Sequence, residues 1–206
     1  NPTPVVDSTN GLTWVLYNRW QPGFGTVASQ PGTDNCQAWA RFSVDSGATW
    51  SDAIDITTQA RDYAAWGAIF FGPGGGIQAQ DGRLLIPSAY KPGGTGDLAT
   101  MRPYVVYSAD HGATWQRGAA FNVSANENQL IELADETILI DARQWSGSNR
   151  YNAISANGGE TWGAMFPGET VTAVACAIER FTLESAGDDA NRILWSGPAG
   201  SGRANL

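Results

Sequence analysis

The stretch Ser108-Ala-Asp110-His-Gly112-Ala-Thr114-Trp115 occurs in two further copies in this chain of 206 residues. The other copies begin at Ser43 and Ser155, and all three read Ser-x-Asp/Asn-x-Gly-x-Thr-Trp. An Asp or Asn side chain at the third position accepts hydrogen bonds from nearby backbone N–H groups, and glycine allows the positive φ that closes a tight turn. Three copies in register predict a chain built from repeated structural units.

Short strand-like runs precede the copies and recur along the whole chain, so the chain is predicted to be all-β. Turns rich in Gly and Pro, such as Gly72-Pro-Gly-Gly-Gly76, separate the runs. The predicted strands are Leu12–Tyr17, Ala38–Ser43, Arg83–Pro87, Tyr104–Ser108, Gln129–Leu133, Thr137–Asp141, Tyr151–Ser155, Val174–Ile178 and Ile193–Ser196.

The spacing of the three copies, 65 and 47 residues, favours a β-propeller of four-stranded antiparallel blades. At about 45–50 residues a blade, residues 1–206 are expected to form roughly four blades of one domain. The acceptor residues Asp45, Asp110 and Asn157 are expected to be structural, at turns on the blade periphery. Each tryptophan of the pattern is expected to pack on its own blade.

Composition excludes some classes of function. A net charge of −8 argues against nucleic-acid binding. No apolar run is long enough for a transmembrane helix, so no membrane partner is expected. Cys36 and Cys176 lie far apart and lack metal-ligand spacing, which favours two buried thiols over a disulfide and predicts no metal site. No cofactor is expected.

Glu127 and Arg143 are the first candidates for chemistry. If Ala134-Asp-Glu136 is a hairpin loop, Leu133 pairs with Thr137, and the same register places Glu127 opposite Arg143. A neighbouring guanidinium favours the charged carboxylate. Such a carboxylate can accept a proton, and the arginine can hold an anion. An ordinary cross-strand ion pair on a solvated face is the alternative.

Near the end of the chain, a strand runs into a loop rich in Gly, Ser and Pro that carries Arg203. An arginine after such a loop is usually just exposed. By itself this arginine is therefore weak evidence for a binding site.

The three copies resemble the Asp-boxes of sialidases and of other propellers that carry them. More specific segments resemble the exo-sialidases of secreted bacterial, fungal and animal type, in order and spacing over essentially the whole chain. These segments are Asn1-Pro-Thr-Pro-Val-Val6, Gly72-Pro-Gly-Gly-Gly-Ile-Gln78 with Arg83-Leu-Leu-Ile-Pro87, Asn126-Glu-Asn-Gln129 with Asp141-Ala-Arg143, and Trp195-Ser-Gly-Pro198 with Gly202-Arg-Ala-Asn205.

The resemblance implies a six-bladed propeller that hydrolyses terminal sialic acids with retention, and the substrate it implies is a sialylated glycan. The family uses a tyrosine nucleophile with a glutamate base, an aspartate acid and three arginines that bind the sugar carboxylate. Glu127 matches the base, and Arg143 and Arg203 match the second and third arginines. Tyr90 falls where relatives place residues on the glycerol side of the pocket, or else it is a core or surface tyrosine.

Three elements of the family have no match in this chain. The first arginine and the acid would precede Asn1, and the nucleophile would follow Leu206. The resemblance therefore implies an interior part of a propeller, without the first blade and the C-terminal part, whose remainder is missing or is a separate segment. The chain alone is expected to be inactive, and the protein is expected to be secreted or extracellular.

Two other functions remain open. A non-catalytic sugar-binding propeller could keep the Asp-boxes and the arginines, but it has no use for a glutamate base at position 127. A relative that transfers sialic acid, or one that acts on a variant such as the deaminated sugar, would look the same in this segment.

Overall fold

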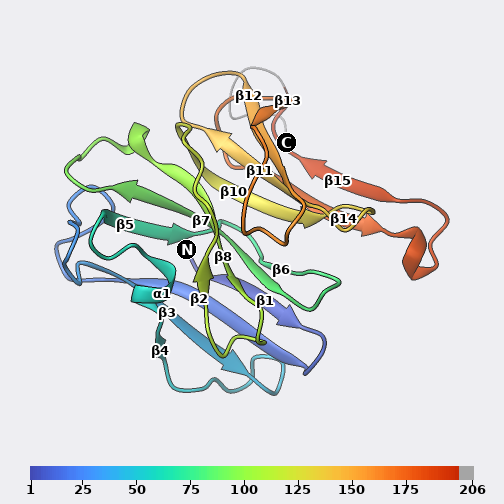
Figure 1. Cartoon of the computed structure of the whole chain (residues 1–206), viewed down its shortest axis with the longest axis horizontal. Helices are drawn as coiled ribbons and strands as arrows, with labels where there is room; N and C mark the ends of the chain where they lie inside the picture. The colour runs from blue at the N-terminus through green and yellow to red at the C-terminus, as the bar shows by residue number, and fades with distance from the viewer. Residues whose placement is uncertain (200–206) are drawn as a thin grey trace.

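In the computed structural model, residues 1–199 are described, and they fold into antiparallel sheets that follow one another along the chain (Figure 1). Blade 1 contains β1 (Thr3–Asp7), β2 (Leu12–Trp20), β3 (Cys36–Ser43) and β4 (Ile54–Asp55). Blade 2 contains β5 (Trp66–Phe71), β6 (Ile77–Gln78), β7 (Leu84–Pro92), β8 (Arg102–Ser108) and β9 (Gln116–Arg117).

Blade 3 contains β10 (Ala125–Glu132), β11 (Ile138–Gln144), β12 (Asn149–Ser155) and β13 (Phe166–Thr170). The C-terminal hairpin consists of β14 (Ala177–Thr182) and β15 (Arg192–Ser196). One α-helical turn, α1 (Thr57–Ala60), and the 3-10 turns η1 (Leu98–Thr100) and η2 (Glu184–Ala186) lie in the connections. The described residues thus form three blades and a hairpin, where roughly four blades were expected.

The all-β class is confirmed, and all but one of the predicted strands coincide with observed ones. The prediction for Val174–Ile178 is wrong, because that strand begins only at Ala177. The Val174 carbonyl accepts a hydrogen bond from Arg150, and the Val174 N–H donates to Thr172, so this segment is a turn. The prediction omitted β1, β5, β13 and the two-residue strands.

The central sheets, those of blades 2 and 3, are buried on both faces. In β7, Leu84 and Ile86 lie in the core between blades 1 and 2, while Leu85 between them lies in the core between blades 2 and 3. The alternation follows from the strand period of two. A third core, which includes Ile131 and Ile178, joins blade 3 to the C-terminal hairpin. Burial of each such aliphatic side chain stabilises the stack by about 1.5–3 kcal/mol.

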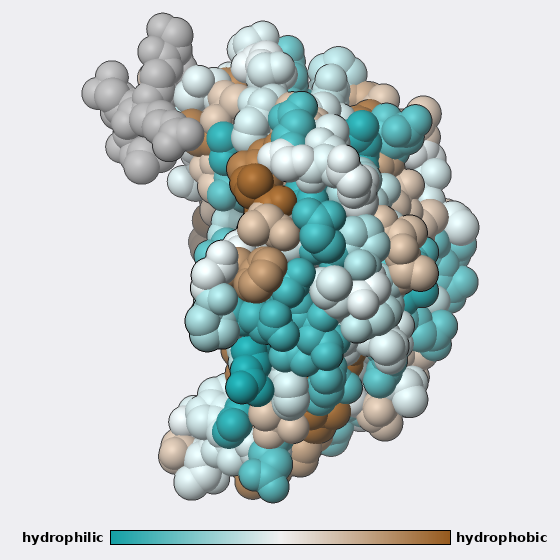
Figure 2. Space-filling model, turned by 90° about the vertical axis from the view of Figure 1, so that its left-hand side faces the viewer, coloured by the Kyte–Doolittle hydropathy of each residue, from teal (hydrophilic) through white to brown (hydrophobic). Residues whose placement is uncertain are grey.

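The outer surface differs from these cores. On the side of the molecule that Figure 2 shows, the surface is mostly hydrophilic, and apolar residues form separate spots.

The repeated octapeptides form the turns that follow β3, β8 and β12. In the second copy, Asp110 Oδ1 accepts the Thr114 N–H at 2.8 Å, and Asp110 Oδ2 accepts the Thr114 hydroxyl at 2.6 Å. Asn157 builds the same turn: Oδ1 accepts the Thr161 N–H at 2.9 Å, and Nδ2 donates to the Thr161 hydroxyl at 2.8 Å. Asn therefore replaces Asp without loss of a contact.

The second and third turns also dock on the preceding blade. A Cβ at Gly112 would lie 2.3 Å from the Trp14 ring of blade 1, and one at Gly159 would lie 2.8 Å from Leu85 of blade 2. Both glycines also have positive φ, +91° and +85°. No other residue fits these sites without strain.

This docking corrects the prediction for the tryptophans of the pattern. Trp115 does not pack only on its own blade, because its ring lies edge-on to Trp14 of blade 1, with centroids 5.8 Å apart. Trp162 packs against Phe121 in the connection to blade 3, with centroids 5.3 Å apart. Trp50, in the first copy, is 40% exposed.

A polar contact completes the junction between blades 1 and 2. The fully buried Asp7 carboxylate, at the end of β1, lies 2.8 Å from Nδ1 of His111 and accepts bonds from the Thr9 N–H and from Gln78. Burial acts to raise the pKa of Asp7, but these hydrogen bonds outweigh burial and hold the pKa below its usual value.

The two cysteines are both buried and free, as predicted. Burial raises the pKa of the Cys36 thiol to about 11. Cys36 therefore remains a protonated core residue at neutral pH.

Replacing Asp110 by Ala should lower the free energy of unfolding by about 1 kcal/mol or more, because two backbone-ordering hydrogen bonds to Thr114 are lost. Urea denaturation measures the change. The matched control is Asn157→Asp, which keeps the acceptor and should stay within about 0.5 kcal/mol of the wild type. Equal losses in both variants would contradict the role assigned to the acceptor oxygen.

Replacing Asp7 by Asn should make stability less sensitive to acid. Because the folded-state pKa of Asp7 is depressed, its contribution is present above the ordinary carboxyl pKa of about 3.9 and is lost as the pH falls through the lower folded-state value. The difference in unfolding free energy between wild type and variant should be largest above about pH 5 and shrink towards about pH 2. A difference that does not change over this range would show that Asp7 is not stabilised as an anion.

Candidate functional site

Glu127 and Arg143 form an ion pair at one end of blade 3. The three-residue loop at 134–136 forms as predicted, with the Leu133 N–H bonded to the Thr137 carbonyl at 2.7 Å. The predicted register is confirmed from Asn128, opposite Ala142, to Glu132, opposite Ile138. Arg143 Nη1 donates to Glu127 Oε2 at 2.5 Å.

The pair lies at the wall of a cavity of about 600 Å³. The cavity is built by the ends of β2, β5, β10 and β11 and by the loops that follow β2 and β7. Its other side chains are mostly apolar or aromatic: Trp20, Phe24, Phe70, Leu98, Met101 and Trp145, with Asn1, Asn18, Thr26 and Asn126 as polar members. An apolar pocket with a few convergent polar groups is typical of small-molecule sites.

Some N–H donors of the Arg143 guanidinium form no hydrogen bond among the described residues. Its side chain is 18% exposed, and its Nε is buried without a hydrogen-bond partner among the described residues. Only Nη1 is used by Glu127. A planar fork with unused donors can bind a carboxylate with directional hydrogen bonds.

A second, deeper ion pair lies beside the first. Arg150 of β12 and Asp141 of β11 are both nearly fully buried, and Arg150 Nε donates to Asp141 Oδ1 at 2.9 Å. The same carboxylate accepts a long 3.4 Å bond from the Trp195 indole of the C-terminal hairpin. This pair therefore fastens the hairpin to blade 3 and does not face the cavity.

The other sequence-predicted residues are placed as follows. Tyr90 is half-buried and stacks on Trp66 with ring centroids 3.9 Å apart, beside the core between blades 1 and 2. It is not among the residues that line the cavity. Burial raises the pKa of its hydroxyl. Arg203 lies outside the described residues.

The octapeptide turns lie away from the cavity, as predicted. In blade 3, the turn begins at Ser155, which pairs with Ile138 of β11, and Ile138 pairs in turn with Glu132 of β10. Glu132 is the last residue of β10, whereas Glu127 lies near its first, so the turn is at the far end of the blade from the cavity. The aromatic lining was not predicted. Trp145 lies directly after the end of β11, two residues beyond Arg143, so continuing the strand period could have placed both side chains on the same face.

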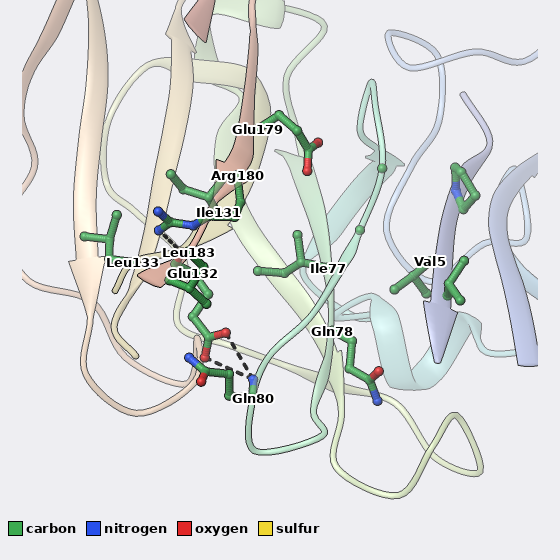
Figure 3. A pocket seen from close by; sticks show the side chains of 14 residues that line it. Val5, Ile77, Gln78, Gln80, Ile131, Glu132, Leu133, Glu179, Arg180 and Leu183 are labelled. Carbon is green, nitrogen blue, oxygen red and sulfur yellow. Dashed lines mark hydrogen bonds between the residues drawn. The ribbon is translucent and has the colours of Figure 1, made fainter. Parts of the chain in front are cut away.

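A second cavity, of about 460 Å³, opens at the opposite end of β10 (Figure 3). Its wall is largely apolar, and its one anchored carboxylate, Glu132, accepts two 3.1 Å bonds from the Gln80 N–H. Burial raises the pKa of Glu132. Arg180 lines this cavity too, but it donates to the Glu132 carbonyl oxygen and has no ion pair among the described residues, so the functional site is assigned to the Glu127 cavity. Residues 1–199 contain no group of His, Cys, Asp and Glu that could hold a metal ion.

The family model and the similar proteins point to the same family. The family described as "BNR repeat-like domain" matches residues 1–185. A sialidase of Bacteroides fragilis is 30% identical over 79% of this chain and 30% of its own length. A sialidase of Micromonospora viridifaciens is 30% identical over 100% of this chain and 31% of its own length.

Solved structures agree on the fold. The Hadza microbial sialidase Hz136 superposes with a TM-score of 0.81 at 24% identity, covering 96% of this chain and 39% of that one. This chain therefore spans less than half the length of each of these three relatives. Among its described residues, none of the helices has the length and apolar character needed to cross a membrane.

A double-mutant cycle should detect the ion pair in solution. Glu127→Ala, Arg143→Ala and the double variant should show a coupling of about 1–3 kcal/mol in urea denaturation, because the pair is charged and mostly buried. The same cycle on the exposed pair Asp189 and Arg192 should give a smaller coupling. A Glu127–Arg143 coupling near zero would show that the two side chains act independently.

Proposed function

This chain belongs to the BNR repeat-like domain family, and we propose that it forms the part of an exo-α-sialidase that contains the glutamate base and one carboxylate-binding arginine. The observation that carries the proposal is the Glu127–Arg143 pair at the wall of an aromatic cavity. Homology to sialidases at about 30% identity supports the substrate class, a glycan that ends in sialic acid.

Sialic acid carries a carboxylate on its anomeric carbon, and this explains the proposed division of roles. The unused donors of Arg143 bind that carboxylate through its planar fork. A carboxylate nucleophile would be repelled by the substrate, whereas a neutral tyrosine is not, and sialidases use a tyrosine. Arg203 is proposed as a further arginine on the same carboxylate.

Glu127 is proposed as the general base that takes the proton from the tyrosine hydroxyl. A free tyrosine has a pKa of about 10, so a carboxylate is a weak base for it. The guanidinium of Arg143, 2.5 Å from Glu127, supplies a positive field that stabilises the negative charge developing on the phenolate oxygen. The apolar and aromatic side chains around the pair make the surroundings less polar than water, which strengthens that interaction.

Binding without catalysis is the main alternative, and Glu127 distinguishes the two. A lectin-like propeller would need Arg143 but would gain nothing from a carboxylate that competes for the same guanidinium. Transfer of the sugar instead of hydrolysis would use the same residues, and analysis of the products distinguishes the two reactions.

Glu127→Gln should lower kcat on a fluorogenic α-sialoside by about a hundredfold or more, because the amide keeps the shape but cannot accept the proton. The assay uses the gene product that contains this chain at full length. Binding of free sialic acid, measured by calorimetry, should survive. Near-normal turnover would rule out Glu127 as the base.

Arg143→Lys is the contrasting variant. A point charge cannot replace the planar fork, so this change should weaken sialic-acid binding. Unchanged affinity in Arg143→Lys would contradict the proposed carboxylate site.

A further inference from the structure

Asn126 and Glu127 are consecutive residues of β10, and yet both line the site cavity. In a regular strand, neighbouring side chains point to opposite faces. The pairing with β11 explains the exception, because Ala125 lies opposite Gln144 and Asn128 opposite Ala142. Two residues of β10 therefore stand against Arg143 alone, which defines a β-bulge that turns Glu127 towards the cavity.

The peptide unit between Asn126 and Glu127 lies at the centre of this bulge, and side chains bind both its N–H and its C=O. The Glu127 N–H donates to Asn126 Oδ1 at 2.7 Å. The Asn126 carbonyl, which belongs to the same peptide unit, accepts a bond from Asn128 Nδ2 at 2.8 Å. These contacts satisfy an N–H and a carbonyl that the bulge removes from the regular ladder.

Asn128 also anchors the bulge to the neighbouring blade. The residue is 1% exposed, and Nδ2 donates a second 2.8 Å bond to the Ser88 carbonyl in β7. One buried amide therefore connects the peptide plane before Glu127 to the central strand of blade 2.

We propose that Asn126 and Asn128 are positioning residues that orient the Glu127 carboxylate towards Arg143 and the substrate. The catalytic role of Glu127 in this inference rests on the proposed function. The statement that the two asparagines orient Glu127 does not depend on it. The orientation of the 126–127 peptide plane determines the backbone direction at Glu127, and the two asparagines hold that plane by its N–H and its C=O. A carboxylate that is misplaced by about 1 Å loses up to a hundredfold in rate.

The decisive variant is Asn128→Leu. Leucine is close to asparagine in size, but it cannot donate the hydrogen bonds to the Asn126 and Ser88 carbonyls. Its matched control is Gln129→Leu. Gln129 follows on the same strand, and its amide also links blades, through the Pro73 carbonyl and the Ile178 N–H, but it lies outside the bulge. Both variants lose hydrogen bonds that are at least partly buried, so both should unfold at lower urea concentration.

The two variants should differ in three measurements on folded protein. In Asn128→Leu, kcat should fall at least about tenfold with KM changed by less than about threefold. The Glu127 amide should exchange with solvent faster, and the NMR signals of the Arg143 guanidinium that report its pairing should be lost. Gln129→Leu should keep wild-type kcat, amide protection and Arg143 signals. Equal loss of kcat in both variants would overturn the proposal, as would full Glu127 amide protection in Asn128→Leu.

A second pair of variants keeps the test valid if Asn128→Leu fails to fold. Asn126→Ala removes the acceptor of the Glu127 N–H, whereas Asn126→Asp retains it. Faster exchange of the Glu127 amide in the first variant and protection in the second are expected, and equal exchange would overturn the proposal. Amide exchange and the Arg143 signals need no turnover. If the wild-type gene product at full length shows no sialidase activity, the proposed function fails, while these signals still decide whether the asparagines position Glu127.

Discussion

Burial of each central sheet on both of its faces is the constraint on which the rest of this structure depends. Consecutive residues of β7 enter two different cores, so a blade is stable only against its neighbours. Across each junction, adjacent sheets are joined by side chains, as at Trp14 and Trp115. Buried polar groups complete the junctions: Asp7 with His111, and Asn128 with the Ser88 carbonyl. The functional cavity opens where several blades meet, and its geometry is therefore a property of the junctions.

The octapeptides combine two roles within eight residues. Their hydrogen bonds close a turn locally, and the glycine at the fifth position lets the turn approach the preceding blade. Local turn chemistry is readable from a single copy, which is why the turns and the strands before them were predicted correctly. The contact with the preceding blade depends on residues far away in the sequence, such as Trp14 and Leu85. The tryptophan environment was therefore predicted wrongly.

The candidate site was predictable to a similar degree. Counting from one hairpin loop predicted that Glu127 and Arg143 are neighbours, because strand pairing is strictly periodic. The same counting could not reveal the bulge, since it assumes one continuous register, whereas the pairing shifts by one residue beyond it and places Ala125 opposite Gln144. Nor could it assemble the aromatic wall, in which Trp20 and Phe70 come from different blades. The environment of Tyr90 could not be predicted either, because its stacking partner, Trp66, is distant in the sequence.

The bulge separates two tasks that one strand would otherwise share. From Asn128 onward, β10 is in regular register and contributes Leu130 and Ile131 to the cores on its two faces. Before Asn128, two residues with their own side-chain contacts present the carboxylate to the cavity. The pocket end of the strand can consequently be altered by mutation or redesign without moving the hydrophobic residues that hold blade 3 in the stack. Asn128 is the point where the two tasks meet, because its amide holds the bulge and also joins β10 to blade 2.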